Sequence, residues 1–226
     1  MNKLSNNRFS SNWCGKSISE LDLDQVSSIL VTGHDANSLS FSKHYMDEIL
    51  KSIEDKTLQN KTCSILDFGC GVGRNLFGVH NYLKENEFRY KDGICDKVNL
   101  TGYDSMEMLS HLRSYSSMIL GVEFNEFNNI SISHSWNEIK SKYYDIIFAN
   151  LVFQHVEVST LEEYLEDIKQ ITNKLVVSGR SVNDFNGNVW RIMLENGYVL
   201  NLEDEYILSS QTDDITHHAR YVYTWE

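Results

Sequence analysis

The chain of 226 residues contains no proline at all and only four cysteines, Cys14, Cys63, Cys70 and Cys95. These cysteines lie far apart in the sequence and form no C-x-x-C pair. Their spacing favours reduced, mostly buried thiols, as in a cytoplasmic protein, and argues against a disulfide framework or a zinc site built on cysteine. The absence of proline by itself indicates no function.

Long apolar runs and basic clusters are missing as well. No apolar stretch reaches the length of about 18 residues that a membrane span requires, so we expect no membrane partner. Residues 1–8 lack the apolar core of a signal peptide. Lysine and arginine number 20 against 32 aspartates and glutamates, and no basic run occurs. The resulting net charge of −12 argues against tight, sequence-independent binding to nucleic acid.

Hydrophobic residues make up 41% of the chain and aromatic residues 12%, which excludes a disordered protein. The length suits one well-buried domain. Residues 1–41 show no strong periodicity, so we expect an irregular N-terminal cap there and a single main domain over residues 42–226.

The main domain alternates predicted strands and helices. We expect strands near residues 62–68, 98–103, 130–133, 144–149 and 174–178, and helices near residues 46–53, 74–84, 106–116, 159–171 and 187–196. Ser159 and Glu162 match a capping box at the start of the fourth of these helices. Two final strands, near 198–208 and 219–225, have no helix between them. The pattern predicts an α/β fold: a doubly wound, mostly parallel seven-stranded sheet with an antiparallel C-terminal edge hairpin and helices on both faces.

The most informative segment runs from Ile65 to Asn75, where an apolar strand ends in Asp67 and three glycines alternate before a helix. Glycines at such a turn permit positive φ and let a ligand lie against bare backbone. The spacing is G-x-G-x-G and differs from the G-x-G-x-x-G of dinucleotide-binding proteins. An acidic residue before the first glycine repels a pyrophosphate but suits a cationic ligand.

This segment resembles the first motif of the class I S-adenosylmethionine (SAM)-dependent methyltransferases, apolar-apolar-Asp-x-Gly-x-Gly-x-Gly. The resemblance covers about residues 42 to 200. It implies SAM as the cofactor, S-adenosylhomocysteine as its product, no metal, and a cap that covers the active site. The cofactor-binding residues that it implies at the turn are Asp67, Gly69, Cys70, Gly71 and Gly73. The alternative is an ordinary turn between a strand and a helix.

The second predicted strand ends in a carboxylate, Asp104. A carboxylate accepts hydrogen bonds from both hydroxyls of a ribose, and the family has its ribose-binding acid here. Ser105 and Met106 would then border the adenine. In the alternative interpretation, Asp104 caps the following helix together with Glu107.

After the third strand, the family often carries an aspartate that accepts from the adenine amino group. This chain has His134-Ser135-Trp136-Asn137 instead. Ser135 or Asn137 can accept that hydrogen bond, and Trp136 can stack on the base. Trp136 can equally belong to the core.

The segment after the fourth strand resembles the fourth motif of the family. The resemblance implies Asn150 and Leu151 as cofactor-binding residues, with Asn150 beside the reacting methyl group. It lacks the prolines of the N-P-P-[Y/F] and D-P-P-Y loops of methyltransferases that act on base amino groups. His155 is the candidate catalytic base, which takes a proton from an attacking hydroxyl or amine. Its alternative role is to pack near the cofactor or cap the following loop.

The leading hypothesis is a methyltransferase that moves a methyl group from SAM to an oxygen or nitrogen of a small molecule. The rival hypotheses are a SAM-binding protein without catalysis, with residues 85–97 and 117–129 as partner surfaces, and a methyltransferase for RNA or protein. Candidates to line the acceptor pocket are Trp13, His34, Tyr45, Phe153, Arg180, Asn183 and Trp190. The pair His217-His218 lacks a third ligand at suitable spacing, so we expect no metal site there.

Overall fold

The computed structural model describes residues 40–71, 73–87, 93–106, 109, 127–150, 152–153, 156–180, 192–193, 195–197, 199–200, 206–208 and 218–224. The cap predicted over residues 1–41 lies outside these ranges apart from its last two residues, which are helical. The division into cap and main domain therefore stays a prediction.

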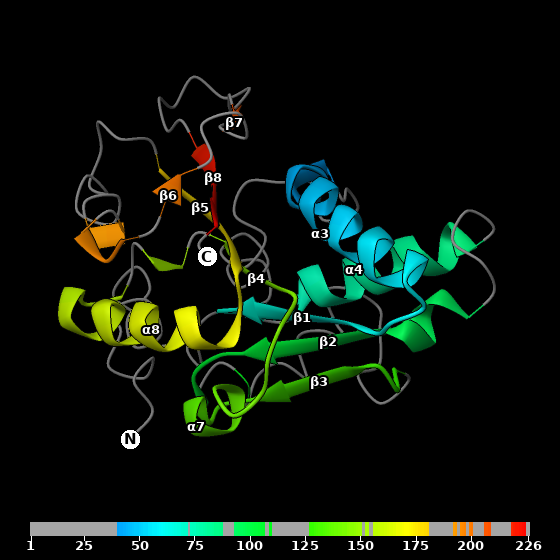
Figure 1. The fold of residues 1–226 in the computed structure, drawn as a ribbon, viewed down its shortest axis with the longest axis horizontal. Coiled ribbons are helices and arrows are strands. Elements are labelled where there is room, and N and C mark those ends of the chain that lie inside the picture. Colours follow the sequence, from blue (N-terminus) through cyan, green and yellow to red (C-terminus); the bar gives the residue numbers. More distant parts are fainter. Residues whose placement is uncertain are drawn as a thin grey trace, which may run out of the picture.

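Five parallel strands form the centre of the protein (Figure 1). They are β1 (Cys63–Phe68), β2 (Val98–Tyr103), β3 (Ile130–Ser133), β4 (Ile146–Asn150) and β5 (Lys174–Arg180). Their order across the sheet is β3-β2-β1-β4-β5, and each neighbouring pair is parallel. The predicted parallel α/β sheet is thus confirmed. Strand order reverses beside β1, which is where open α/β sheets collect ligands at the carboxyl ends of their strands.

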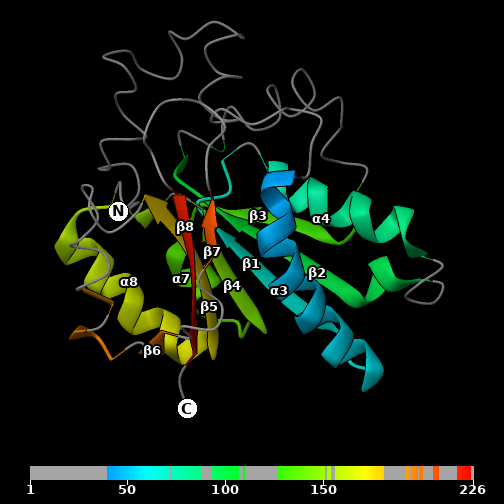
Figure 2. The same cartoon turned by 90° about the horizontal axis from the view of Figure 1, so that it is seen from above.

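Helices cover both faces of this sheet, as the alternation of elements predicts (Figure 2). Helices α3 (Ser40–Leu58) and α4 (Arg74–Glu85) lie on one face. Helices α7 (Trp136–Ile139) and α8 (Val158–Ile171) lie on the other. Because successive strand residues point to opposite faces, β1 contributes to both cores. This double burial explains why β4 begins with a continuous apolar run, Ile146 to Ala149.

Two clusters of buried residues make up the core. The α4-side cluster includes Ile53, Ile65, Leu76, Val79, Leu83, Leu100, Ile146 and Val176. The α8-side cluster includes Leu66, Phe68, Tyr103, Trp136, Ile147, Phe153, Leu161, Tyr164, Leu165 and Ile168. The predicted apolar face of α8 is confirmed, since five of its residues are buried with their spacing near three and four.

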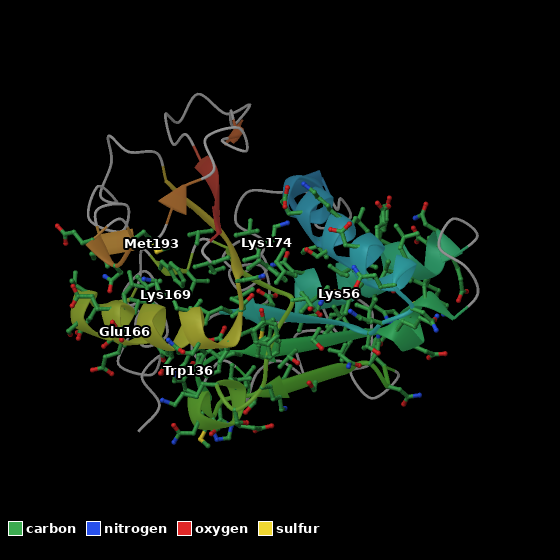
Figure 3. All side chains as sticks on the ribbon, in the orientation of Figure 1. Lys56, Trp136, Glu166, Lys169, Lys174 and Met193 are labelled. Carbon is green, nitrogen blue, oxygen red and sulfur yellow. The ribbon has the colours of Figure 1, made fainter. Side chains whose placement is uncertain are left out.

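Ion pairs anchor α3 to the sheet. Lys56 Nζ lies 2.6 Å from Asp145 Oδ1, and the second oxygen of Asp145 accepts a hydrogen bond of 2.8 Å from the backbone N–H of Ser64. Lys174, at the start of β5, pairs with Glu48 of α3; Figure 3 labels both lysines. The pKa of Lys56 is raised, chiefly by its hydrogen bond to Asp145. None of the helices in the described ranges is long and apolar enough to cross a membrane.

The C-terminal tail adds strands on the far side of β5. Strand β8 (His218–Thr224) pairs antiparallel with β5, and the short strands β6 (Val199–Leu200) and β7 (Tyr206–Leu208) pair antiparallel with β8. The predicted strand over 198–208 is thus present as two short segments. The connections between these strands lie outside the described residues, so the seven-stranded count and the edge hairpin stay predictions.

The predicted capping box at the start of α8 is wrong. The helix begins at Val158 with Glu157 as its N-cap and has no side-chain cap. Ser159 is therefore already inside the first turn and cannot serve as the cap. Two short elements were not predicted, the 3-10 helix η3 (Ile94–Lys97) and α7. Four residues are too few for periodicity to reveal a helix.

Candidate functional site

The turn after β1 has the backbone that its glycines predict. Gly69, Gly71 and Gly73 have φ angles of 80°, 55° and 79°, all in the left-handed region. The backbone N–H groups of Gly69 and Cys70 both donate to the carbonyl oxygen of Tyr103, at 2.7 and 3.1 Å. These two hydrogen bonds hold the turn against the end of β2.

The three glycines differ in what surrounds them. A Cβ atom at Gly69 would lie 2.4 Å from Cγ2 of Val152, and one at Gly73 would lie 3.0 Å from Cε2 of Phe77. A Cβ atom at Gly71 would meet no atom of the described residues within 4 Å. Packing thus demands glycine at the first and third positions. At Gly71 bare backbone borders open space, which is the feature that a ligand lying against this turn requires.

Asp104 joins the glycine turn to the end of β2. The side chain is only 8% exposed, and its two oxygens each accept a hydrogen bond of 2.7 Å, one from the N–H of Gly71 and one from the N–H of Ser105. Burial raises the pKa of Asp104 to about 6, and these two N–H groups oppose the rise. A carboxylate has about four acceptor positions, so two remain for further donors. Glu107, the partner in the capping interpretation, lies outside the described residues.

Asp67 is fully buried beneath the same turn. Neither of its carboxylate oxygens has a hydrogen-bond partner among the described residues. Burial and the charge of Asp104 raise the pKa of Asp67 well above its usual range, while a polar contact from the Asn75 side chain, too distorted to count as a hydrogen bond, opposes the rise. The ion pairs of the described residues involve other carboxylates. A buried acid without a partner is costly, and such groups are concentrated at functional sites.

The remaining residues predicted at the first two strand ends differ in exposure. Ser105 is fully buried, whereas Met106 is 57% exposed at the edge of the site. Cys70 is buried, and burial together with the neighbouring carboxylates raises the pKa of its thiol well above the usual range. The structure therefore brings Asp67, the three glycines, Cys70, Asp104 and Ser105 together at one edge of the sheet.

Gly102 belongs to the same arrangement but was not predicted from the sequence. A Cβ atom there would lie 2.7 Å from Sγ of Cys70 and 2.8 Å from Cδ1 of Leu76. Gly102 is the register partner of Asp67, so its missing side chain makes the room in which the glycine turn packs onto β2. A glycine inside a predicted strand was the available signal, since it often marks a close approach.

Substituting Gly102 by alanine is therefore expected to lower the free energy of unfolding by about 1–3 kcal/mol, the usual cost of overpacking. Urea denaturation measures this cost. The same substitution in a Cys70→Ala background should cost less, because the atom nearest to the new methyl group is gone. Equal costs in both backgrounds would show that Cys70 does not set the spacing.

Ser135 and Trp136 follow β3. Ser135 is the N-cap of α7, and its side chain accepts from the backbone N–H of Glu138. Trp136 is 7% exposed, packs edge-on against Phe68 and Tyr164, and donates from Nε1 to Asp167 Oδ2 at 2.7 Å. For Trp136 this is the core role that the sequence left open. Stacking on a base, and acceptance from it by Ser135, stay predictions.

The end of β4 is described only in part. Asn150 is the last residue of the strand and is the register partner of Ser178 on β5. Leu151 and His155 lie outside the described residues, so the proposed base is untested. Phe153 is 1% exposed and packs edge-on against Phe68, which makes it part of the core. The other candidates for the acceptor pocket, or their side chains, lie outside the described residues: Trp13, His34, Tyr45, Arg180, Asn183 and Trp190. Within the described ranges no three His, Cys, Asp or Glu side chains are grouped so as to hold a metal ion.

Comparison with known proteins shows the fold. No family model and no curated protein matches the chain by sequence. Solved structures do match. Magnesium protoporphyrin IX methyltransferase from Synechocystis PCC 6803, with bound SAM, has a TM-score of 0.53 at 11% identity over 89% of this chain and 90% of its own. A SAM-dependent methyltransferase from Aquifex aeolicus has a TM-score of 0.52 at 14% identity over 90% of this chain and 98% of its own. The methyltransferase domain of bacterial CtHen1 has a TM-score of 0.53 at 16% identity over 90% of this chain and all of its own. The chain thus has the fold of the class I SAM-dependent methyltransferases.

Proposed function

We propose that this protein is a SAM-dependent methyltransferase that moves a methyl group to an oxygen or nitrogen atom of a small molecule. One observation carries the proposal: the bare backbone at Gly71 has no atom of the other described parts of the chain on its Cβ side, and the buried carboxylates of Asp67 and Asp104 lie at the ends of the two strands that the turn joins by hydrogen bonds. The shared fold with SAM-dependent methyltransferases supports it.

The residues of the turn fit a cationic nucleoside. The two unused acceptor positions of Asp104 match the two hydroxyls of a ribose. Asp67, whose oxygens have no partner among the described residues, suits the positively charged amino group of the methionine part. A pyrophosphate would instead meet two acidic side chains and is disfavoured there.

Bound SAM supplies a methyl group on a sulfonium, which is already an activated leaving group, so the protein needs mainly to position the acceptor and exclude water. Asn150, at the end of β4, and Leu151 are proposed to border the methyl group. His155 is proposed as the base for acceptors that must lose a proton. The magnesium protoporphyrin IX methyltransferase among the similar structures favours a small acceptor.

The decisive experiment incubates the purified protein with methyl-labelled SAM and a pool of small metabolites. We expect the label to move to a small molecule, with formation of S-adenosylhomocysteine. Label on RNA or protein would instead indicate a methyltransferase with a macromolecular acceptor. Binding of S-adenosylhomocysteine without any transfer would indicate a non-catalytic SAM-binding protein, and no binding heat for either compound would refute the proposal.

The affinity for S-adenosylhomocysteine is expected to rise with pH through the pKa of Asp104, about 6. Ribose hydroxyls donate to the ionised carboxylate, so linkage predicts a gain of about tenfold between pH values of about 5 and 7. Calorimetric titrations across this range measure the gain, and the Asp104→Asn variant should lack it.

The stability of the free protein should change in the opposite direction. Because the folded state raises the pKa of Asp104 from 3.8 to about 6, the folded protein holds this proton more tightly than the unfolded chain does. The contribution of Asp104 to the free energy of unfolding is therefore largest below pH 3.8 and is lost as pH rises through about 6. For the binding titrations, an affinity for S-adenosylhomocysteine that falls as pH rises through about 6 would contradict the assignment of Asp104 to the ribose.

A further inference from the structure

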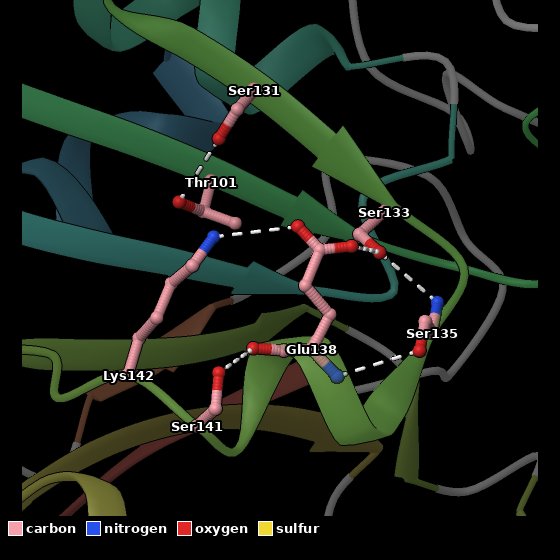
Figure 4. A network of polar contacts seen from close by, with 7 residues as sticks. All are labelled: Thr101, Ser131, Ser133, Ser135, Glu138, Ser141 and Lys142. Carbon is pink, nitrogen blue, oxygen red and sulfur yellow. Dashed lines mark hydrogen bonds and ion pairs between the residues drawn. The ribbon is translucent and has the colours of Figure 1, made fainter.

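Three residues form a closed ring of hydrogen bonds between the end of β3 and the start of α7 (Figure 4). The hydroxyl of Ser133 donates to Glu138 Oε2 at 2.7 Å and accepts from the backbone N–H of Ser135 at 3.0 Å. The backbone N–H of Glu138 lies 3.4 Å from Oγ of Ser135 and 3.1 Å from its carbonyl oxygen. We refer to Ser133, Ser135 and Glu138 as the serine relay.

The relay is an extended capping box. In the ordinary capping box, the Glu side chain accepts directly from the N–H of the N-cap residue. Here the hydroxyl of Ser133 stands between Glu138 and the N–H of Ser135, donating to one and accepting from the other. Such linked hydrogen bonds polarise one another. The pKa of Glu138 is lowered, chiefly by the hydrogen bond from Ser133.

Helix stability alone does not account for the relay. Helix α7 has only four residues, and so short a helix gains little from its own hydrogen bonds. Its inner side is already held, because Trp136 is buried and donates to Asp167. The ion pair between Lys142 and Glu138 is about half exposed on both side chains, and such surface pairs contribute little. The relay therefore acts mainly on the backbone between Ser133 and Glu138.

That backbone lies beside the proposed ribose carboxylate. Ser133 is the register partner of Tyr103, and the N–H of Asp104 points to the carbonyl oxygen of Ser133 at 3.4 Å. In the strand order β3-β2-β1, the glycine turn lies on one side of Asp104 and the segment 134–137 on the other. A nucleoside with its ribose on Asp104 and its amino acid part on the glycine turn therefore directs its base toward residues 134–137.

We propose that Ser133 and Glu138 are positioning residues that set the selectivity of the site for the nucleobase. They hold the backbone of 134–137, whose exposed members His134 and Asn137 then meet the base edge in one fixed geometry. This inference rests on the proposed binding of a SAM-type nucleoside. In this role, Ser133 and Glu138 affect the discrimination between bases by holding residues 134–137, and they do not touch the ligand.

The test compares the calorimetric affinities for S-adenosylhomocysteine and S-inosylhomocysteine, which differ only in the base. The wild-type protein should prefer the adenine compound. Ser133→Ala and Glu138→Ala should reduce this preference by about twofold to tenfold, the effect of one misplaced hydrogen bond. Glu138→Gln should largely restore it, because the amide oxygen still accepts from Ser133.

Two neighbouring residues provide matched controls. Lys142→Ala removes the ion pair to Glu138, and Ser141→Ala removes a hydrogen bond to the carbonyl oxygen of Glu138, but both leave the hydrogen bonds among Ser133, Ser135 and Glu138 in place. Both variants should keep the wild-type preference. Thermal unfolding of each variant separates loss of fold from loss of selectivity, and Glu138 is exposed, so its alanine variant is expected to fold.

The outcomes distinguish the inference from the proposed function. If neither compound binds the wild-type protein, the proposed function fails. If both bind and the preference is absent, or is unchanged in folded Ser133→Ala and Glu138→Ala, only the role of the relay is refuted. A uniform loss of affinity for both compounds would likewise refute it and leave a purely structural role.

Discussion

Replacing Gly71 by valine is expected to abolish binding of S-adenosylhomocysteine, with a loss of affinity of more than about a hundredfold. The φ of 55° disfavours any β-branched residue at this position. The new side chain would also enter the space beside Gly71 that is free of atoms from the described ranges, on the side where the ligand is proposed to lie. Isothermal titration measures the loss directly.

Gly93 provides the matched control for this change. It also has a left-handed φ, 79°, and the one atom of the described residues that a Cβ there would meet is Oδ2 of Asp96, at 3.7 Å. Gly93→Val should therefore carry a similar backbone strain, of about 1–3 kcal/mol, without affecting binding. If Gly71→Val fails to fold, Gly71→Ala provides a milder version of the test. A folded Gly71 variant that binds as tightly as the wild-type protein would exclude the turn as the contact surface.

Substituting Asp104 by alanine is expected to weaken binding of SAM by more than about tenfold, because two charge-assisted hydrogen bonds to a ribose, of about 1.5–3 kcal/mol each, are lost. The structure adds a second consequence. The N–H groups of Gly71 and Ser105 would lose their acceptor, so the free energy of unfolding should fall as well. Titration calorimetry and urea denaturation measure the two effects separately.

Asp55 supplies the control for the loss of one negative charge, since it is exposed on α3. Asp55→Ala should leave both affinity and stability close to wild type. In Asp104→Asn one acceptor oxygen remains for either Gly71 or Ser105, so this variant should recover part of the stability but little of the affinity. An Asp104→Ala variant that folds and binds SAM with wild-type affinity would remove the ribose assignment.

Two strands were predicted with their full bounds. The bounds of β2 and β3 agree with the prediction to the residue, because apolar and polar residues alternate in both, as in Val98-Asn99-Leu100-Thr101 and Ile130-Ser131-Ile132-Ser133, which is the period of a strand. Predictions were less accurate at helix starts. At α8 the prediction relied on Ser159 and Glu162, yet the helix begins at Val158 without a side-chain cap. Cap residues are only a preference, and burial of the apolar face decides where the helix packs.

The sequence by itself determined the parallel core of the fold and the glycine turn. Periodicity specifies which residues are buried, and a left-handed backbone specifies glycine, so both are readable from the order of residues alone. Only the tertiary structure decided which atoms meet: that Asp104 accepts from Gly71, that Gly102 makes room for Cys70, and that Ser133 connects Glu138 to Ser135. The Asp104–Gly71 and Gly102–Cys70 contacts join residues about 30 positions apart through the register of neighbouring strands, which no local pattern encodes. The Ser133–Glu138 contact is local, but it depends on where β3 ends and α7 begins.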